Sequence, residues 1–102
     1  MQPFTAQVIE IISAIPAGKV MTYGQVAGAA GSPRAARQVV RILHSMSGKH
    51  GLPWHRVVNA RGEIAIREEE GFFLQKMFLE GEGVEVTEDG LVNLARYQHS
   101  PS

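Results

Sequence analysis

The 102-residue sequence contains no cysteine. It can therefore form no disulfide, no thiolate metal site and no cysteine nucleophile. Without a thiolate, the chain also has no sulfur that could accept an alkyl group in a covalent reaction. Aromatic residues are few, at 7%, and Trp54 is the single tryptophan.

Long hydrophobic runs are also missing, since no apolar stretch approaches the ~20 residues that a helix needs to cross a bilayer. The N-terminus lacks a basic segment followed by a long apolar one, so we expect a cytoplasmic, nucleoid-associated protein that is neither secreted nor bound to membranes. The length predicts one domain over residues 1–102 with a single modest core. We expect the protein to be a monomer. We predict residues 98–102 to be a disordered tail.

The net charge of zero conceals an uneven distribution of charged residues along the chain. The first 61 residues contain seven Lys and Arg residues and one acidic residue, whereas the remaining 41 contain three and nine. A basic first half suits contacts with DNA phosphates, because Lys and Arg replace the counterions condensed on the backbone. The acidic half should face away from DNA. A soluble domain that is merely dipolar is the alternative.

Helical periodicity and capping residues predict two helices in the first third of the chain. Apolar residues recur at helical spacing over Phe4–Ile15, with Thr5 as a cap close to the start. Thr22 is predicted to cap a second, short helix over Tyr23–Ala30, which Gly31 ends.

A third, basic helix is predicted to follow after a tight turn. Ser32 is its expected cap, and Pro33 occupies the first helical position, where its missing N–H has no cost. Arg34, Arg37 and Arg41 are spaced three and four residues apart, which puts them on one face. Two short helices joined by a tight turn, the second of them basic, are typical of a helix-turn-helix.

The rest of the chain predicts shorter elements bounded by glycine-rich turns. These are a loop over Ser47–Gly51, a wing-like hairpin of Val57–Val58 with Glu63–Ile66, a last helix over Gly71–Leu79, and a terminal hairpin of Val84–Val86 with Leu91–Asn93.

The segment Pro53–Val57 reads Pro-Trp-His-Arg-Val and has the form of a catalytic motif without its nucleophile. By itself, Trp54 between proline and histidine is most simply a core anchor. Together with Thr22–Ala27 and Ser32–Val40, however, the segment resembles the O6-alkylguanine-DNA alkyltransferases, whose reactive cysteine lies in a Pro-Cys-His-Arg-Val motif. Trp54 stands where that cysteine would be, as in the alkyltransferase-like proteins, which do not transfer the alkyl group. The resemblance covers about Phe4–Val86.

This resemblance implies an α+β, mainly helical fold, a winged helix-turn-helix like the C-terminal domain of the alkyltransferases. It implies a protein that is not an enzyme and needs no cofactor or metal. Such a protein binds O6-alkylguanine in double-stranded DNA, flips the nucleotide, and hands the lesion to nucleotide excision repair proteins without repairing it.

The resemblance also assigns roles at the DNA. The residue matching Arg37 enters the base stack and fills the gap left by the flipped nucleotide, and Arg34 and Arg41 lie beside it as DNA contacts. Tyr23 matches a tyrosine that crowds the phosphate next to the target and helps to rotate the base outwards. The simpler alternatives are a phosphate contact for Arg37 and a half-buried turn anchor for Tyr23.

A lesion pocket is implied around Trp54, whose indole offers apolar surface and an N–H donor. Leu43 corresponds to an apolar pocket wall and Arg67 to a position that lines the base pocket. The backbone groups of Trp54 and Val57 are expected to read the guanine edge.

The remaining motif residues are implied to support the site. Pro53, His55 and Arg56 keep the family pattern, and His55 has no thiol to activate, so we expect it to be structural. The matching family glutamate is Glu82, whose relay role we expect to be idle. A departure from the enzymes occurs at Glu68–Gly71, which replaces a Tyr-Ser-Gly-Gly loop.

Three other functions are alternatives to lesion binding. A metal enzyme would use His44, His50 and His55, but their spacing is irregular and the Glu68–Glu70 run is typical of a solvated loop. A winged-helix regulator without lesion specificity would leave the Trp54 segment with no role beyond packing. A residual alkyltransferase would need a nucleophile that the sequence lacks.

Overall fold

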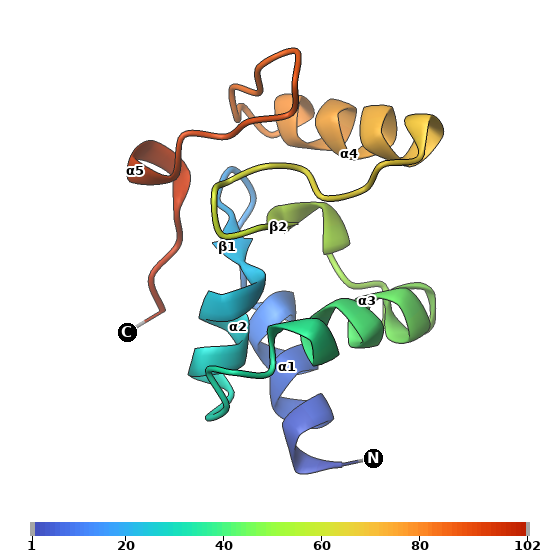
Figure 1. The fold of residues 1–102 in the computed structure, drawn as a ribbon, viewed down its shortest axis with the longest axis vertical. Helices are drawn as coiled ribbons and strands as arrows, with labels where there is room; N and C mark the ends of the chain where they lie inside the picture. The colour runs from blue at the N-terminus through green and yellow to red at the C-terminus, as the bar shows by residue number, and fades with distance from the viewer. Residues whose placement is uncertain (1, 102) are drawn as a thin grey trace.

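The computed structural model describes residues 2–101, and helices dominate it (Figure 1). The elements in chain order are α1 (Pro3–Ser13), β1 (Met21–Thr22), α2 (Tyr23–Ala29), α3 (Ala36–His50), the 3₁₀ helix η1 (Trp54–Arg56), β2 (Val57–Val58), α4 (Glu69–Gly81) and α5 (Leu94–Tyr97). The mainly helical α+β class is confirmed. Within residues 2–101, no helix has the length and apolar character needed to span a membrane.

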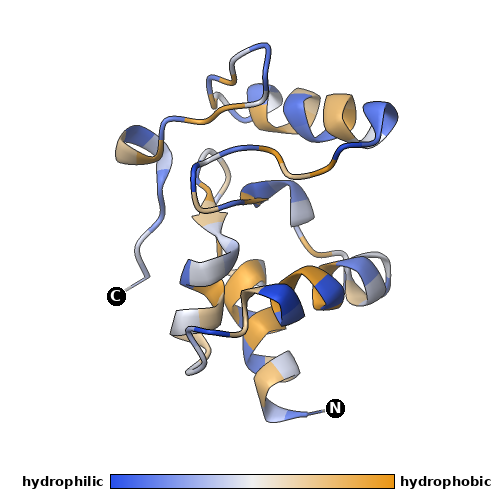
Figure 2. Cartoon of the chain, in the orientation of Figure 1, coloured by the Kyte–Doolittle hydropathy of each residue, from blue (hydrophilic) through white to orange (hydrophobic). Residues whose placement is uncertain are grey.

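Two hydrophobic clusters form the core, where we predicted one. The first lies where α1, α2 and α3 meet, and Figure 2 shows apolar stretches of these helices at that place. The second lies beneath α4 and the C-terminal segment, and it contains Val20, Val58, Ile64, Leu79, Val84, Val92 and Tyr97. β1 and β2 lie between the helical cluster and α4 (Figure 1). Buried residues of these strands contribute to both clusters.

Capping explains where α1 and α2 begin. The predicted cap at Thr5 is wrong. α1 begins at Pro3, so Thr5 lies inside its first turn, and Gln2 is the residue at the cap position. The predicted cap of α2 is confirmed: the Thr22 hydroxyl accepts from the Gln25 N–H at 3.0 Å. The Gln25 side chain accepts from the Thr22 N–H at 3.3 Å, which completes a reciprocal capping box.

Ser32 belongs to the end of α2 and does not open α3, contrary to the prediction. Gly31 has a φ of 92° and donates to Gly28, while the Ser32 N–H donates to the Ala27 carbonyl at 2.9 Å. These two bonds satisfy the last carbonyls of α2 in a Schellman motif. Residues 32–35 then form a turn, and α3 begins at Ala36.

α3 continues through the segment predicted as a loop. Ser47–His50 extends the helix by about a turn, and Gly51, with a φ of 60°, ends it. Gly51 donates to the Ser47 carbonyl, as expected for a left-handed glycine cap. Glycine at position 48 did not break the helix, because it lies less than one turn from an end that Gly51 caps.

The predicted wing hairpin is wrong. Val57–Val58 pairs in parallel with Met21–Thr22, and the segment Glu63–Ile66 does not pair with it. Both valines are fully buried, which is typical of strands covered on both faces. The chain after β2 instead makes a turn in which the Asn59 N–H donates to the Glu63 carbonyl at 3.0 Å.

The C-terminal third differs in its details from the prediction. α4 begins two residues earlier than predicted because the Glu68 carboxylate caps it, accepting from the N–H groups of Glu70 and Gly71 at 2.9 Å. The terminal hairpin consists of a single antiparallel bridge between Val86 and Val92. The short helix α5 follows this bridge and was not predicted.

The predicted disordered tail is wrong for its first two residues. Gln98 forms a parallel bridge with Val20, and the His99 N–H donates to the Val20 carbonyl at 2.8 Å. The Gln25 side chain also bonds both residues. The tail therefore closes over β1 and α2. Ser102 lies outside the described residues.

Candidate functional site

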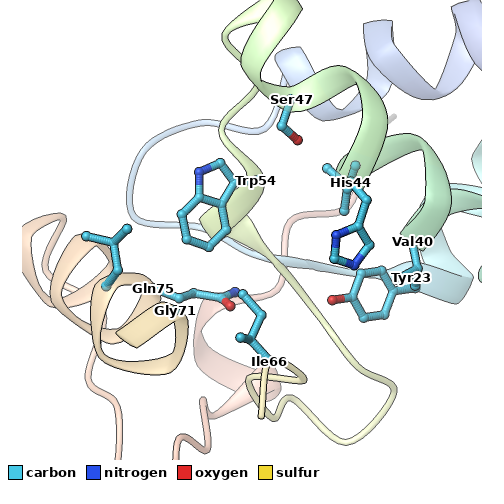
Figure 3. Close-up of a pocket in the computed structure, with 10 residues that line it drawn as sticks. Tyr23, Val40, His44, Ser47, Trp54, Ile66, Gly71 and Gln75 are labelled. Atoms are coloured by element: carbon cyan, nitrogen blue, oxygen red, sulfur yellow. The ribbon is translucent and has the colours of Figure 1, made fainter. Parts of the chain in front are cut away.

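A pocket of about 330 Å³ opens between α3 and α4 (Figure 3). It is lined by Tyr23, Val40, Leu43, His44, Ser47, Trp54, Ile66, Gly71, Leu74 and Gln75. This volume is at the lower end of the roughly 300–1,000 Å³ that small-molecule sites occupy. The lining is mostly apolar with a few polar groups, which is the composition typical of a site that holds an aromatic ligand.

Trp54 forms part of the pocket wall and is only partly buried. The backbone N–H of Trp54 donates to the Leu52 carbonyl at 2.8 Å, and this bond fixes the start of η1. The indole meets the ring of Phe78 on α4 edge to face, with centroids 6.0 Å apart, and lies 6.1 Å from the His55 ring. These contacts hold the indole in place from one side and leave its other side to the pocket.

A second part of the wall comes from α3 and the start of α2. Val40, Leu43, His44 and Ser47 are spaced by three and four residues, so they lie on the face of α3 that is turned towards the pocket. Tyr23 joins them beside His44, across the pocket from Trp54 (Figure 3). Burial raises the pKa of the Tyr23 phenol, so it remains a neutral hydrogen-bond donor at neutral pH.

Glu82 is the centre of a hydrogen-bond network, which gives it a structural role that the sequence did not predict. Its carboxylate accepts from Arg56 at 2.6 and 3.0 Å, from the Gly18 N–H at 3.1 Å, and lies 2.8 Å from His55 Nε2. Hydrogen bonds from Arg56, and then from His55 and Gly18, lower its pKa to about 2 against the opposing effect of burial. Arg56 also donates to the Ile15 carbonyl at 2.8 Å. The network joins the end of α4 to η1 and to the turn after α1.

Gln75 is a site residue that the sequence analysis missed. Its side chain is 1% exposed, and Nε2 donates to the carbonyls of His55 at 3.0 Å and Val57 at 3.1 Å. It therefore joins α4 to the Trp54 segment while also lining the pocket. Its spacing of three from Phe72 and four from Leu79 was a usable signal, because it places a polar residue on the buried face of α4.

The model of the 6-O-methylguanine DNA methyltransferase DNA-binding domain matches residues 3–84. The chain belongs to this family. The resemblance inferred from the three sequence motifs is thereby confirmed.

Relatives that span the whole chain carry names without an enzymatic activity. The DNA base-flipping protein of Vibrio parahaemolyticus is 41% identical over 99% of this chain and 100% of its own length. Alkyltransferase-like protein 1 of Schizosaccharomyces pombe is 40% identical over 99% of this chain and 98% of its own. The crystal structure of S. pombe Atl1 with damaged DNA containing O6-carboxymethylguanine matches with a TM-score of 0.86, 40% identity, and 99% and 98% coverage. Because it lacks an acceptor cysteine, the chain is not a cysteine-dependent alkyltransferase.

In this member of the family, the three predicted DNA-contacting arginines are all exposed, but they do not share one helix. Arg37 and Arg41 lie on α3 at a spacing of one turn, whereas Arg34 lies in the turn before it. Arg34 lies outside α3 because Ser32 belongs to the end of α2, and α3 therefore begins only at Ala36. Arg37 and Arg41 thus present guanidinium groups on α3, with the pocket-lining residues on an adjacent face of the same helix.

Two of the four predicted pocket residues lie elsewhere. Leu43 and Trp54 line the pocket, but Val57 is 1% exposed and Arg67 is an exposed residue next to the lining residue Ile66. The backbone groups expected to read the guanine edge are already bonded. The N–H of Val57 donates to the Trp54 carbonyl, and the Val57 carbonyl accepts from Gln75.

Pro53, His55 and Arg56 are placed as supports of the pocket. Pro53 precedes η1 and its carbonyl accepts from the Arg56 N–H at 3.0 Å. The side chains of His55 and Arg56 both turn towards the Glu82 carboxylate. In residues 2–101 no three His, Cys, Asp or Glu side chains are grouped so as to hold a metal ion. The metal-enzyme alternative therefore lacks a ligand set in this part of the chain.

Proposed function

We propose that this protein binds O6-alkylguanine in double-stranded DNA, rotates the lesion into the Trp54 pocket and holds it there with its alkyl group intact. The observation that carries the proposal is that Trp54, which the Pro-Trp-His-Arg-Val motif matches to the family's cysteine, lines a preformed pocket beside a helix with exposed arginines. A relative that covers the whole chain is called a DNA base-flipping protein, and the matching S. pombe structure holds DNA with O6-carboxymethylguanine.

Arg37 and Tyr23 have the properties needed for nucleotide flipping. Arg37 is exposed on α3, and its planar guanidinium can occupy the space in the base stack that the flipped nucleotide leaves. Tyr23, at the start of α2, reaches the pocket wall and can guide the base inwards. These contacts offset the unpairing and unstacking energy, a few kcal/mol, which is smallest for a damaged base.

Once the base is in the pocket, the surrounding residues can bind it but cannot react with it. Trp54 offers an apolar face and an indole N–H, and neither attacks an alkyl carbon at neutral pH. His55, which would be the proton acceptor for a nucleophile, is held against the Glu82 carboxylate at 2.8 Å. The complex is therefore a stable marker of the lesion.

A marker without chemistry needs a system that removes the lesion, and we propose that nucleotide excision repair proteins respond to it. The protein is proposed to act as a monomer in the cytoplasm, associated with the nucleoid.

A reconstituted excision reaction tests the proposed repair partner. Adding the protein to this reaction should increase incision beside O6-methylguanine. Unchanged incision at saturating protein would contradict this part of the proposal.

Comparing two duplexes that differ by one methyl group tests lesion recognition. The protein should bind a duplex with a single O6-methylguanine at least several-fold more tightly than its unmodified twin, because only the lesion is flipped at low cost and packed against Trp54. Fluorescence anisotropy at fixed salt measures both affinities. Equal affinities would favour the alternative function, a winged-helix regulator without lesion specificity, which the basic α3 would also allow.

A further inference from the structure

The hydroxyl of Ser47 is buried and has no hydrogen-bond partner within residues 2–101. Serines in helices commonly satisfy their hydroxyls on the carbonyl four residues earlier. Ser45, on the same helix, does so: its Oγ donates to the Arg41 carbonyl at 3.0 Å. Ser47 differs because its side chain is on the face of α3 that lines the pocket.

Ser47 is joined through the backbone to the segment that carries Trp54. Its carbonyl accepts from the N–H groups of Gly51 and Leu52, the latter at 3.0 Å, and the Leu52 carbonyl accepts from the Trp54 N–H at 2.8 Å. Figure 3 shows the Ser47 hydroxyl on the α3 side, directed towards the space between Trp54 and His44. The unpaired hydroxyl therefore belongs to the Trp54 end of the pocket.

Three other polar side chains of the lining are placed differently from Ser47. Gln75 Nε2 is used by two backbone carbonyls, and Tyr23 and His44 lie across the pocket from Trp54. The neighbouring lining residues Leu43 and Leu74 are apolar. A buried hydroxyl without a partner is unfavourable, and a ligand that supplies the missing hydrogen bond removes that penalty.

We propose that Ser47 is a hydrogen-bonding subsite for the O6 substituent and favours alkyl groups that carry a terminal hydroxyl. The inference rests on the proposed function, because it is Trp54, at the position of the alkyl-accepting cysteine, that marks where the substituent lies. A plain alkyl chain fills the same space but leaves the Ser47 hydroxyl unpaired. A hydroxyalkyl chain can exchange a hydrogen bond with it after rotation about the serine side-chain bond.

A two-by-two binding cycle tests this subsite. One axis compares duplexes containing O6-(2-hydroxyethyl)guanine and O6-propylguanine, whose substituents have the same number of heavy atoms. The other axis compares the parent protein with Ser47→Ala. The ratio of affinities for hydroxyethyl over propyl should fall roughly three- to tenfold on substitution, the size expected for one hydrogen bond. An unchanged ratio would overturn the inference.

Two controls separate this role from a structural one. Ser45→Ala removes a hydroxyl that is already bonded outside the pocket, so it should leave the ratio unchanged. Ser47→Ala should melt at the same temperature as the parent or higher, because it removes an unpaired buried group. A lower melting temperature would show that the hydroxyl is bonded within the free protein and would contradict the inference.

The same cycle distinguishes failure of the subsite from failure of the proposed function. If the parent binds both lesions more tightly than unmodified DNA but Ser47→Ala leaves the ratio unchanged, only the subsite is refuted. If the parent binds neither lesion more tightly than unmodified DNA, the proposed function and the subsite are refuted together.

Discussion

Arg37→Ala is expected to weaken binding to lesion-containing and unmodified duplexes alike, by roughly tenfold or about 1.4 kcal/mol. The substitution removes a charge that we propose contacts DNA and a guanidinium plane that can stack in the vacated position. The loss of a phosphate-neutralising charge should also lower the slope of log affinity against log salt by about one. Titrations of both duplexes at several salt concentrations measure these effects.

Arg37→Lys is the matched control, because it keeps the charge and loses the plane. The lysine variant should retain the salt slope of the parent but lose part of the preference for the lesion. If Arg37→Ala binds the O6-methylguanine duplex as tightly as the parent does, Arg37 does not fill the gap in the stack.

Glu82→Gln is expected to destabilise the protein by about 2 kcal/mol at neutral pH, which corresponds to a melting temperature lower by roughly 8–15 °C. The substitution leaves Arg56 without its charged partner and weakens the hydrogen bond between His55 and the side chain at position 82. The figure is below the 3–5 kcal/mol of a fully buried pair, since the Glu82 side chain is 17% exposed and partly screened.

The same variant should reveal a pH dependence of known sign. The pKa of Glu82 is about 2 in the folded protein, below the ordinary value of 4.5. Its contribution to stability is therefore fully present above about pH 4.5 and is lost as the pH falls from 4.5 towards 2. The difference in melting temperature between parent and Glu82→Gln should shrink over that range.

Glu80→Gln serves as the control for this comparison, because the Glu80 side chain is 47% exposed and forms an ion pair with the neighbouring Lys76 on the surface of α4. Its effect on the melting temperature should be small at every pH. A Glu82→Gln variant as stable as the parent at pH 7, or a difference that does not depend on pH, would contradict the role assigned to the network.

Local sequence signals predicted the elements that local interactions determine. The capping box at Thr22, the glycine that ends α2 and the apolar stripe of α1 all depend on residues within one or two turns. The resemblance of the Pro53–Val57 motif predicted a pocket at Trp54 and Leu43, and both residues line the pocket.

Features that depend on distant residues were missed. Val57–Val58 pairs with Met21–Thr22, more than thirty residues away, and periodicity carries no information on such a partner. The Glu82 network joins the turn at Gly18 to the Trp54 segment and the end of α4, so its members look unrelated in the sequence. A serine between two helices can belong to the end of the first or cap the start of the second. The hydrogen bond from the Ser32 N–H to the Ala27 carbonyl places Ser32 at the end of α2.

Trp54 is the only tryptophan, so fluorescence excited selectively from tryptophan reports on the wall of the pocket. Titration with a duplex carrying one O6-methylguanine should change its intensity or wavelength and saturate at one protein per lesion, because the flipped base packs against the indole. Unmodified duplex at the same degree of saturation should leave the emission close to that of the free protein. If both duplexes change the emission equally, or the bound lesion leaves it unchanged, the lesion does not enter the pocket.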